Sequence, residues 1–128
     1  MSKFKEDDLQ KQVAKYLDYN KVLWFHPANE RKTSPQAGKR LKDKGVKSGV
    51  PDCMILTPKG RFKGLALELK VTKDNGYKKN GQQRKPTKGV LSDNQREWLI
   101  NLTAIGWETK VAYCFDEAKI FIDNYLSL

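Results

Sequence analysis

The pattern of apolar and polar positions divides the chain into seven predicted elements. Short apolar runs bounded by Pro, Gly and charged residues are typical of strands, while apolar residues three or four positions apart are typical of helices. The expected strands cover residues 22–26, 49–56, 65–71 and 109–115, and the expected helices cover residues 6–19, 92–106 and 116 onward. The order helix, strand, strand, strand, helix, strand, helix predicts an α/β fold with a mixed β-sheet flanked by helices.

The helix boundaries have local signals of their own. Ser92 followed by Gln95 is a capping box, in which each side chain binds the other's backbone N–H, and Gly106 is well placed to end that helix. We expect Asp116 to cap the last helix. The capping box alone accounts for Gln95, but it leaves a role at a functional site open.

The two middle strands carry the candidate chemistry. Residues 49–56 are apolar on both faces, which predicts a central strand. In residues 65–71 the Leu and Val side chains share one face, while Ala66, Glu68 and Lys70 share the other. If the turn at residues 58–61 makes an antiparallel hairpin, Asp52 and Glu68 meet at one end. Two carboxylates there form a site for a hard cation, and Lys70 beside them could hold a water or a phosphate.

The first helix offers a third carboxylate. At about 100° per residue, Glu6 and Gln10 project on the side of the apolar Val13 and Leu17. An acid in the first turn usually serves only the helix dipole. The alternative is that Glu6 points to the cation, with Gln10 beside it.

Composition restricts the class of protein. The chain of 128 residues is 38% hydrophobic and 31% charged, as expected for a single globular domain over residues 1–128. It has no apolar run near the roughly 20 residues of a membrane span and no apolar signal region, so we expect a cytoplasmic protein. Cys53 and Cys114 are expected to be reduced thiols in buried strands. With the lone His26, which is more often structural than catalytic, they cannot form a four-ligand zinc site.

The net charge of +10 indicates a polyanionic partner, with nucleic acid ahead of a membrane. The charge gathers in two predicted loops at about residues 31–47 and 72–90, which flank the motif strands. Loops of this composition are often merely solvated, but their position next to those strands favours contact with phosphates. The expected DNA-binding residues are Arg31, Lys32, Lys39, Arg40, Lys42, Lys44, Lys47, Lys73, Lys78, Lys79, Arg84, Lys85 and Lys88.

Several strings together resemble a known family. Pro51-Asp52 followed by Glu68-Leu69-Lys70 resembles the signature of the PD-(D/E)XK restriction-endonuclease-like nucleases. The likeness to the VRR-Nuc branch of that superfamily covers nearly the whole chain, at the size of stand-alone bacteriophage and prophage proteins. It is carried by Lys47-Ser48-Gly49-Val50-Pro51-Asp52, residues 64–71, Leu91-Ser92-Asp93-Asn94-Gln95, Gly106-Trp107-Glu108 and residues 26–30.

The resemblance implies a restriction-endonuclease-like core and a site. The metal ligands fall on Asp52, Glu68 and the backbone carbonyl of Leu69, the active-site lysine on Lys70, the helical glutamate on Glu6, and a further glutamine on Gln95. The name-giving Val-Arg-Arg string is replaced here by Glu68-Leu69-Lys70-Val71. The implied protein is an endonuclease dependent on Mg²⁺ or Mn²⁺ that cuts branched DNA, in particular four-way (Holliday) junctions, as a homodimer without an organic cofactor.

Two other interpretations stay open at this point. The first is a non-catalytic nucleic-acid-binding module on a nuclease fold, which metal binding would separate from an enzyme. The second is a nuclease of the same fold that acts on other DNA, such as a flap, nicking or restriction-type enzyme. Mapping cleavage on linear and branched DNA would discriminate between these.

Overall fold

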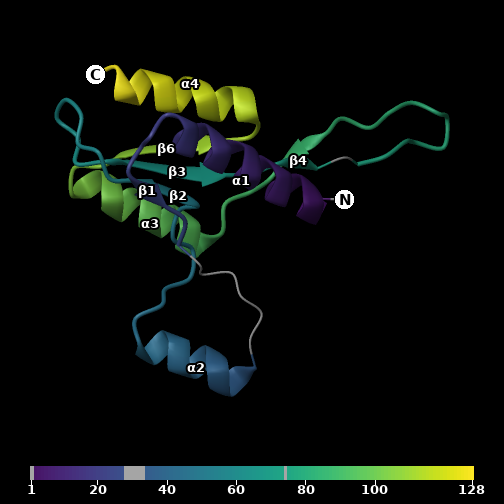
Figure 1. Cartoon of the computed structure of the whole chain (residues 1–128). Helices are drawn as coiled ribbons and strands as arrows, with labels where there is room; N and C mark the ends of the chain where they lie inside the picture. Colours follow the sequence, from purple (N-terminus) through teal and green to yellow (C-terminus); the bar gives the residue numbers. More distant parts are fainter. Residues whose placement is uncertain (1, 28–33, 74) are drawn as a thin grey trace.

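A computed structural model describes residues 2–27, 34–73 and 75–128. It confirms the predicted mixed α/β fold, with a four-stranded sheet between two layers of helices (Figure 1). No helix in these ranges has the length and apolarity needed to cross a membrane. The elements in chain order are α1 (Ser2–Tyr19), β1 (Trp24–Phe25), α2 (Pro35–Asp43), β2 (Cys53–Ile55), β3 (Leu65–Leu69), β4 (Thr72–Lys73), β5 (Thr87–Lys88), α3 (Asp93–Ala104), β6 (Glu108–Ala112) and α4 (Phe115–Leu126).

The main sheet has the strand order β1-β2-β3-β6. β2 pairs antiparallel with β1 and β3, and β6 pairs parallel with β3. β2 is therefore a central strand and the β2–β3 hairpin forms, both as predicted. In its register Cys53 lies opposite Leu67. Continuing that register by one residue at the same end brings Asp52 level with Glu68.

Alternation along β3 distributes its side chains between two cores. Leu65 and Leu67 pack under α1 and α4, together with Leu17 and Ile122. Ala66 instead joins a smaller cluster on the α3 side. Figure 1 shows α1 and α4 on one face of the sheet and α3 on the other. Glu68 has the parity of Ala66, so its carboxylate emerges toward the start of α3.

The sequence suggested that the first basic segment is a loop, but part of it forms a helix. Residues 28–33 lie outside the described part, but residues 35–43 form α2. Ser34 is its N-cap and accepts a hydrogen bond from the N–H of Ala37 at 3.2 Å, while Pro35 occupies the first turn. The helix has no buried residue and stands away from the sheet (Figure 1).

The second basic segment is a β-hairpin rather than a loop. β4 and β5 pair antiparallel, and a further bridge joins Tyr77 to Gln83. Asn75 ties the two sides together, because its side chain donates to the carbonyl of Lys85 at 2.8 Å. We call β4, β5 and residues 75–86 the basic arm, and Figure 1 shows it projecting from the body of the protein.

The C-terminal strand is shorter than predicted. β6 ends at Ala112, and the next residues turn into α4, with Cys114 as the exposed N-cap. The predictions that Cys114 lies buried in a strand and that Asp116 caps this helix are therefore wrong. The chain turns here because the N–H of Tyr113 binds the carboxylate of Glu117 at 2.7 Å, which fixes the first turn of the helix.

Candidate active site

Residues from both halves of the chain meet in a small pocket of about 90 Å³ beside the sheet. α1, the end of β1, the residues before β2, the end of β3 and the start of α3 all contribute to it. All of the predicted catalytic residues line this pocket. The lining residues are Glu6, Asp7, Gln10, His26, Asp52, Glu68, Leu69, Lys70 and Gln95.

Asp52 is fixed from two sides. Only 9% of its surface is exposed, and its Oδ2 accepts the backbone N–H of Leu69 at 2.7 Å. His26 Nδ1 lies 2.7 Å from the backbone oxygen of Asp52. Since a carbonyl oxygen can only accept, Nδ1 carries the proton in this contact. The lone histidine thus has the structural role expected of it, although its ring also lines the pocket.

Glu68 is more deeply buried than Asp52, at 1% exposure. Gln95 Nε2 donates to Glu68 Oε1 at 3.3 Å, while Gln95 Oε1 accepts the backbone N–H of Ser92 at 2.9 Å. The same amide therefore closes the capping box, as predicted, and contacts the candidate site. The helix cap and the carboxylate are thereby joined in one hydrogen-bond network.

Asp52 and Glu68 place two buried carboxyl groups side by side, an arrangement that a bound cation can stabilise. Within the described residues no three His, Cys, Asp or Glu side chains converge into a complete metal cage. Mg²⁺ does not require one, because it is commonly bound by one or two carboxylates together with waters and substrate phosphates. Asp52, Glu68 and the carbonyl of Leu69 are oxygen donors of this kind, so the donor set fits a hard divalent cation.

Lys70 adds a basic side chain to the site. Its backbone N–H donates to the carbonyl of Ala112 at 2.9 Å, which ties it to β6. Gly89, at the base of the basic arm, allows a close approach to the backbone beside Lys70. A Cβ added at Gly89 would lie 3.1 Å from the oxygen of Val71 and 3.5 Å from Lys70 Cδ. Nothing in the sequence singled out Gly89, because its neighbour is distant along the chain.

α1 forms the remaining wall. Gln10 Nε2 lies 3.7 Å from Cys53 Sγ, and Glu6 is exposed at the rim of the pocket. Asp7, the next residue on the helix, also lines the pocket. The pKa of the Cys53 thiol is raised to about 12, mainly by burial and less by the nearby carboxylates of Asp52 and Glu68, against the lowering effect of the hydrogen bond from Gln10. Cys53 therefore stays a neutral thiol at physiological pH.

The two cysteines are expected to differ in reactivity. Iodoacetamide should label the exposed Cys114 in the native protein but leave Cys53, whose thiol is buried and protonated, untouched. Intact mass spectrometry at pH 8 should show a single adduct, and the Cys114→Ser variant should show none. Rapid labelling of Cys53 in that variant would contradict the packing of α1 over the sheet.

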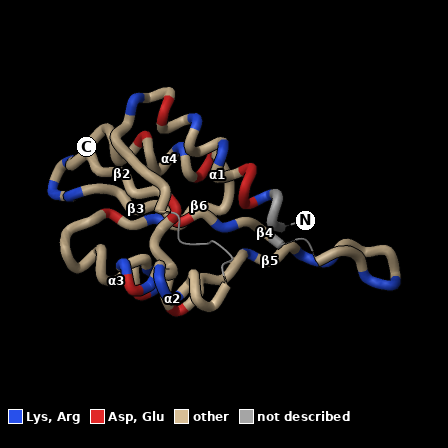
Figure 2. Tube along the Cα trace, turned by 60° about the horizontal axis from the view of Figure 1, so that its bottom comes forward, with Lys and Arg blue, Asp and Glu red and all other residues tan. Residues whose placement is uncertain are grey.

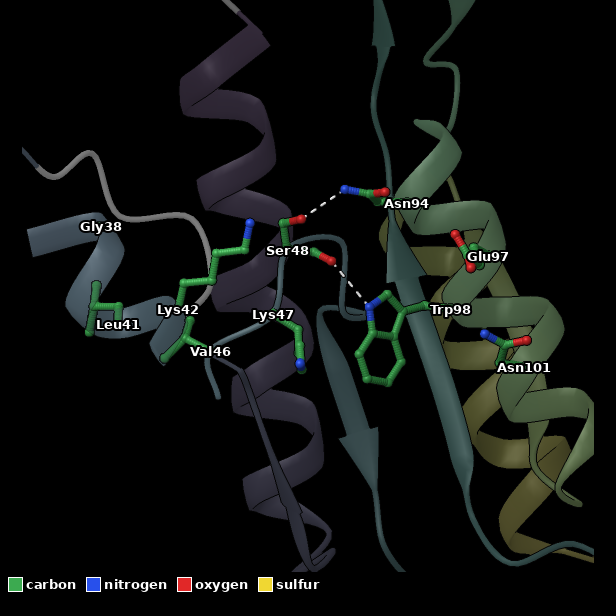
Figure 3. Close-up of a pocket in the computed structure, with 10 residues that line it drawn as sticks. All are labelled: Gly38, Leu41, Lys42, Val46, Lys47, Ser48, Asn94, Glu97, Trp98 and Asn101. Carbon is green, nitrogen blue, oxygen red and sulfur yellow. Dashed lines mark hydrogen bonds between the residues drawn. The ribbon is translucent and has the colours of Figure 1, made fainter. Parts of the chain in front are cut away.

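The loop of residues 47–52 ends at Asp52 and packs against α3 through Ser48 (Figure 3). Asn94 Nδ2 donates to Ser48 Oγ at 2.8 Å, and Trp98 Nε1 donates to the carbonyl of Ser48 at 3.1 Å. Gly49 has φ +81°, and a Cβ there would lie 2.8 Å from the backbone of Asn94. This close approach sets the position of Asp52 relative to Gln95, the next residue on α3.

The basic residues gather on two projections that flank the pocket. Figure 2 shows Lys and Arg along α2 and on the basic arm. Arg31, Lys32 and the side chain of Lys73 lie outside the described residues. The other ten predicted DNA-binding residues are all exposed, and none forms an ion pair within the described part of the chain. These are Lys39, Arg40, Lys42, Lys44, Lys47, Lys78, Lys79, Arg84, Lys85 and Lys88.

Comparisons with known proteins agree with the predicted fold. A family model described as the VRR-NUC domain matches residues 3–116. A solved structure of a VRR_NUC domain protein superposes with a TM-score of 0.70 at 26% sequence identity, covering 96% of this chain and 88% of that protein. The comparison with curated proteins gave no match.

Proposed function

Because the chain belongs to the VRR-NUC domain family, a family of nuclease-type domains, we propose that it is a metal-dependent endonuclease acting on branched DNA. Four-way junctions are the proposed substrate and Mg²⁺ or Mn²⁺ the proposed cofactor. The pairing of Asp52 with Glu68 and Lys70 supports placing it among the PD-(D/E)XK nucleases, and the proposed setting is the cytoplasm of a bacterium that carries the phage or prophage gene.

One observation carries this proposal. The structure brings Asp52 and Glu68 together as buried neighbours, with Lys70 lining the same pocket, although 16 positions separate the two acids in the sequence. Burying two acidic side chains next to each other is costly for a fold, and a bound cation can offset that cost. Together with the exposed basic side chains of α2 and the basic arm, the two acids support the proposal of chemistry on a phosphodiester.

The chain's own residues would divide the work as follows. Leu69 N–H holds the carboxylate of Asp52 in a fixed orientation, and Gln95 does the same for Glu68. Mg²⁺ or Mn²⁺ bound by these two acids and the Leu69 carbonyl would supply Lewis-acid stabilisation of the charge that develops on the phosphate. Lys70 would donate hydrogen bonds to the attacking water and to a phosphate oxygen, adding a fixed positive charge. Glu6, at the rim, would hold the water shell of the cation.

The exposed lysines should dominate DNA affinity through phosphate contacts. The double variant Lys78→Ala/Lys79→Ala on the basic arm should bind DNA more weakly and should reduce the salt slope of log K by about one to two. The matched control is Arg61→Ala/Lys63→Ala, which removes two charges from the exposed turn at the other end of β2 and β3. Fluorescence anisotropy over a salt series measures both. Equal slopes for the two variants would show that the arm does not contact DNA.

Paired cleavage of a four-way junction requires two sites related by symmetry, and one chain supplies one site. We therefore expect a homodimer. Sedimentation velocity at micromolar concentration should show twice the chain mass of 14.7 kDa. A monomer under these conditions would remove the paired-incision part of the proposal while leaving single-strand cleavage in place.

The substrate preference is tested by comparing end-labelled four-way junction, flap and linear duplex DNA of the same sequence, each with Mg²⁺ or Mn²⁺. The expected result is faster cleavage of branched DNA, with cuts next to the branch point. Equal rates on linear duplex would support a nuclease of other purpose. Tight binding without cleavage of any substrate would instead support a binding module.

A further inference from the structure

We propose that the cleft between α2 and α3 binds one unpaired nucleotide of the DNA substrate, next to the phosphate at the active site. This inference rests on the proposed function, since it assumes a DNA substrate. It assigns a ligand to a cavity that the hydrolytic site does not use. The chemistry recognised is an unstacked base together with its own phosphate.

The cleft is large and separate from the hydrolytic pocket. Its volume is about 710 Å³, and its walls come from α2, α3 and the loop that joins residues 44–48 to the sheet. Figure 3 shows Leu41, Lys42 and Val46 on one side, with Trp98, Asn94 and Asn101 on the α3 side. Ligand cavities in proteins are commonly about 300–1,000 Å³. A nucleotide fits such a space, whereas a DNA duplex does not.

The walls have the two kinds of surface that a base needs. Trp98 presents an aromatic ring, which its hydrogen bond to the Ser48 carbonyl at 3.1 Å holds in place, while Leu41 and Val46 supply apolar surface on the α2 side. Bases taken out of a stack bind between aromatic and apolar side chains in this way. The side-chain amide of Asn101, and the oxygen of the Asn94 amide whose nitrogen binds Ser48, can hydrogen-bond base edges.

The charge of the cleft also fits a nucleotide. Lys42 and Lys47 line it, and Lys39, Arg40 and Lys44 lie on or beside the same helix. Among the described residues that line it, Glu97 is the one acid. A carboxylate on the α3 wall suits the amino group of a base rather than a phosphate, so it favours a base that enters with its edge toward α3.

Two covalent connections place the cleft beside the hydrolytic site. Ser48 lines the cleft, and four residues later the same loop delivers Asp52. Asn94 lines the cleft, and the next residue, Gln95, binds Glu68. A strand whose phosphate lies at Asp52 and Glu68 would therefore place a neighbouring nucleotide on the side of the cleft and Trp98.

The exposure of α2 is consistent with a ligand that packs against it. The apolar Leu41 of the helix lines the cleft, yet the helix has no buried residue, and Val46 after it is 38% exposed. Its high positive charge favours a polyanion over a second apolar protein surface as the occupant.

The test is a coupling measurement between protein and DNA variants. The change Val46→Asp alters an exposed wall residue, and Ile120→Asp is its matched control, with 55% exposure on α4 across the sheet. Trp98→Leu is a second variant that removes the ring. Affinities are measured without divalent metal for a four-way junction and a linear duplex, intact or with one abasic site moved stepwise along the strand near the branch.

At one nucleotide position, removing the base should weaken wild-type binding about ten-fold. Both cleft variants should lose this sensitivity, and Ile120→Asp should keep it. Coupling at a paired position of the linear duplex would identify a base extruded from a helix, whereas coupling only at the branch would identify a base that was already unpaired.

Equal wild-type affinities for intact and abasic DNA at every position would overturn the nucleotide assignment. So would a change in sedimentation of Val46→Asp without a change in DNA affinity, because it would show that a second copy of the chain covers the cleft. Cleavage by the wild-type protein with Mg²⁺, measured on the same intact DNA, separates these outcomes from failure of the proposed function, which absence of cleavage would indicate.

Discussion

The Asp52→Asn variant is expected to cleave DNA about 10³-fold more slowly than the wild type while remaining folded. The change removes a carboxylate charge from the candidate metal site, where Lewis-acid stabilisation contributes several kcal/mol to the transition state. The amide oxygen of asparagine can still accept the Leu69 N–H that now binds Asp52 Oδ2 at 2.7 Å. Single-turnover cleavage with saturating enzyme measures the rate, and circular dichroism checks the fold.

The control for this experiment is Asp116→Asn, an equal change of charge on the exposed surface of α4. It should leave the cleavage rate within about two-fold of the wild type. DNA affinity of Asp52→Asn without metal should be unchanged or higher, since a negative charge near phosphate is removed. Wild-type cleavage by Asp52→Asn would exclude the buried carboxylate pair as the hydrolytic site.

Replacing Gly49 by alanine should destabilise the protein and slow cleavage together. A non-glycine residue at φ +81° costs about 1–2 kcal/mol, and a Cβ at 2.8 Å from the backbone of Asn94 adds about 1–3 kcal/mol of steric strain. We expect a melting temperature lower by about 10 °C or more. Because the strain moves the start of α3, it should also disturb the contact between Gln95 and Glu68.

The variant Gly45→Ala separates the cost of the positive φ from the cost of the steric contact with α3. Gly45 also has a positive φ, of +102°, but a Cβ there meets nothing within 4 Å. Its substitution should therefore show only the smaller conformational cost and should leave cleavage near the wild-type rate. Thermal melts of both variants measure the difference. Equal stabilities would mean that residues 47–52 do not pack against α3 as closely as described.

The β2–β3 hairpin and its chemistry could be predicted because its signals are local. A short turn between two apolar runs specifies the pairing, and two-residue periodicity then assigns Glu68 to the face opposite Leu67. The capping box at Ser92 is equally local and was predicted correctly. For these residues, the sequence pattern and the packing favour the same arrangement.

Segments whose structure depends on few tertiary contacts were harder to predict. α2 has no buried residue, so its Lys- and Gly-rich sequence gives little apolar periodicity, and only Ser34-Pro35 indicates a helix start. The basic arm is held by pairing of its own backbone and by Asn75, not by an apolar core. In both cases charge predicted the exposed position correctly, while the loop assignment was wrong.

The family resemblance predicted that Glu6 and Gln95 lie at the site of Asp52 and Glu68, but other contacts between distant parts of the chain could not be predicted. The backbone contact of His26 with Asp52, and the close approach of Gly89 to the backbone oxygen of Val71, depend on how distant segments pack together. Cys114 was placed wrongly for a different reason. Its apolar neighbours extended the predicted strand past Tyr113, although the backbone N–H of Tyr113 binds Glu117 and the strand has ended there. A single sequence has no signal for either kind of contact.

The most direct test of the central claim is a time course of wild-type cleavage on an end-labelled four-way junction, with Mg²⁺, with Mn²⁺ and with a chelator. The paired acids Asp52 and Glu68, with Lys70 beside them, predict strand cleavage with either metal, none with the chelator, and strong loss in Lys70→Ala. Cleavage that persists in the chelator, or that Lys70→Ala leaves unchanged, would contradict a metal-dependent nuclease site in this pocket.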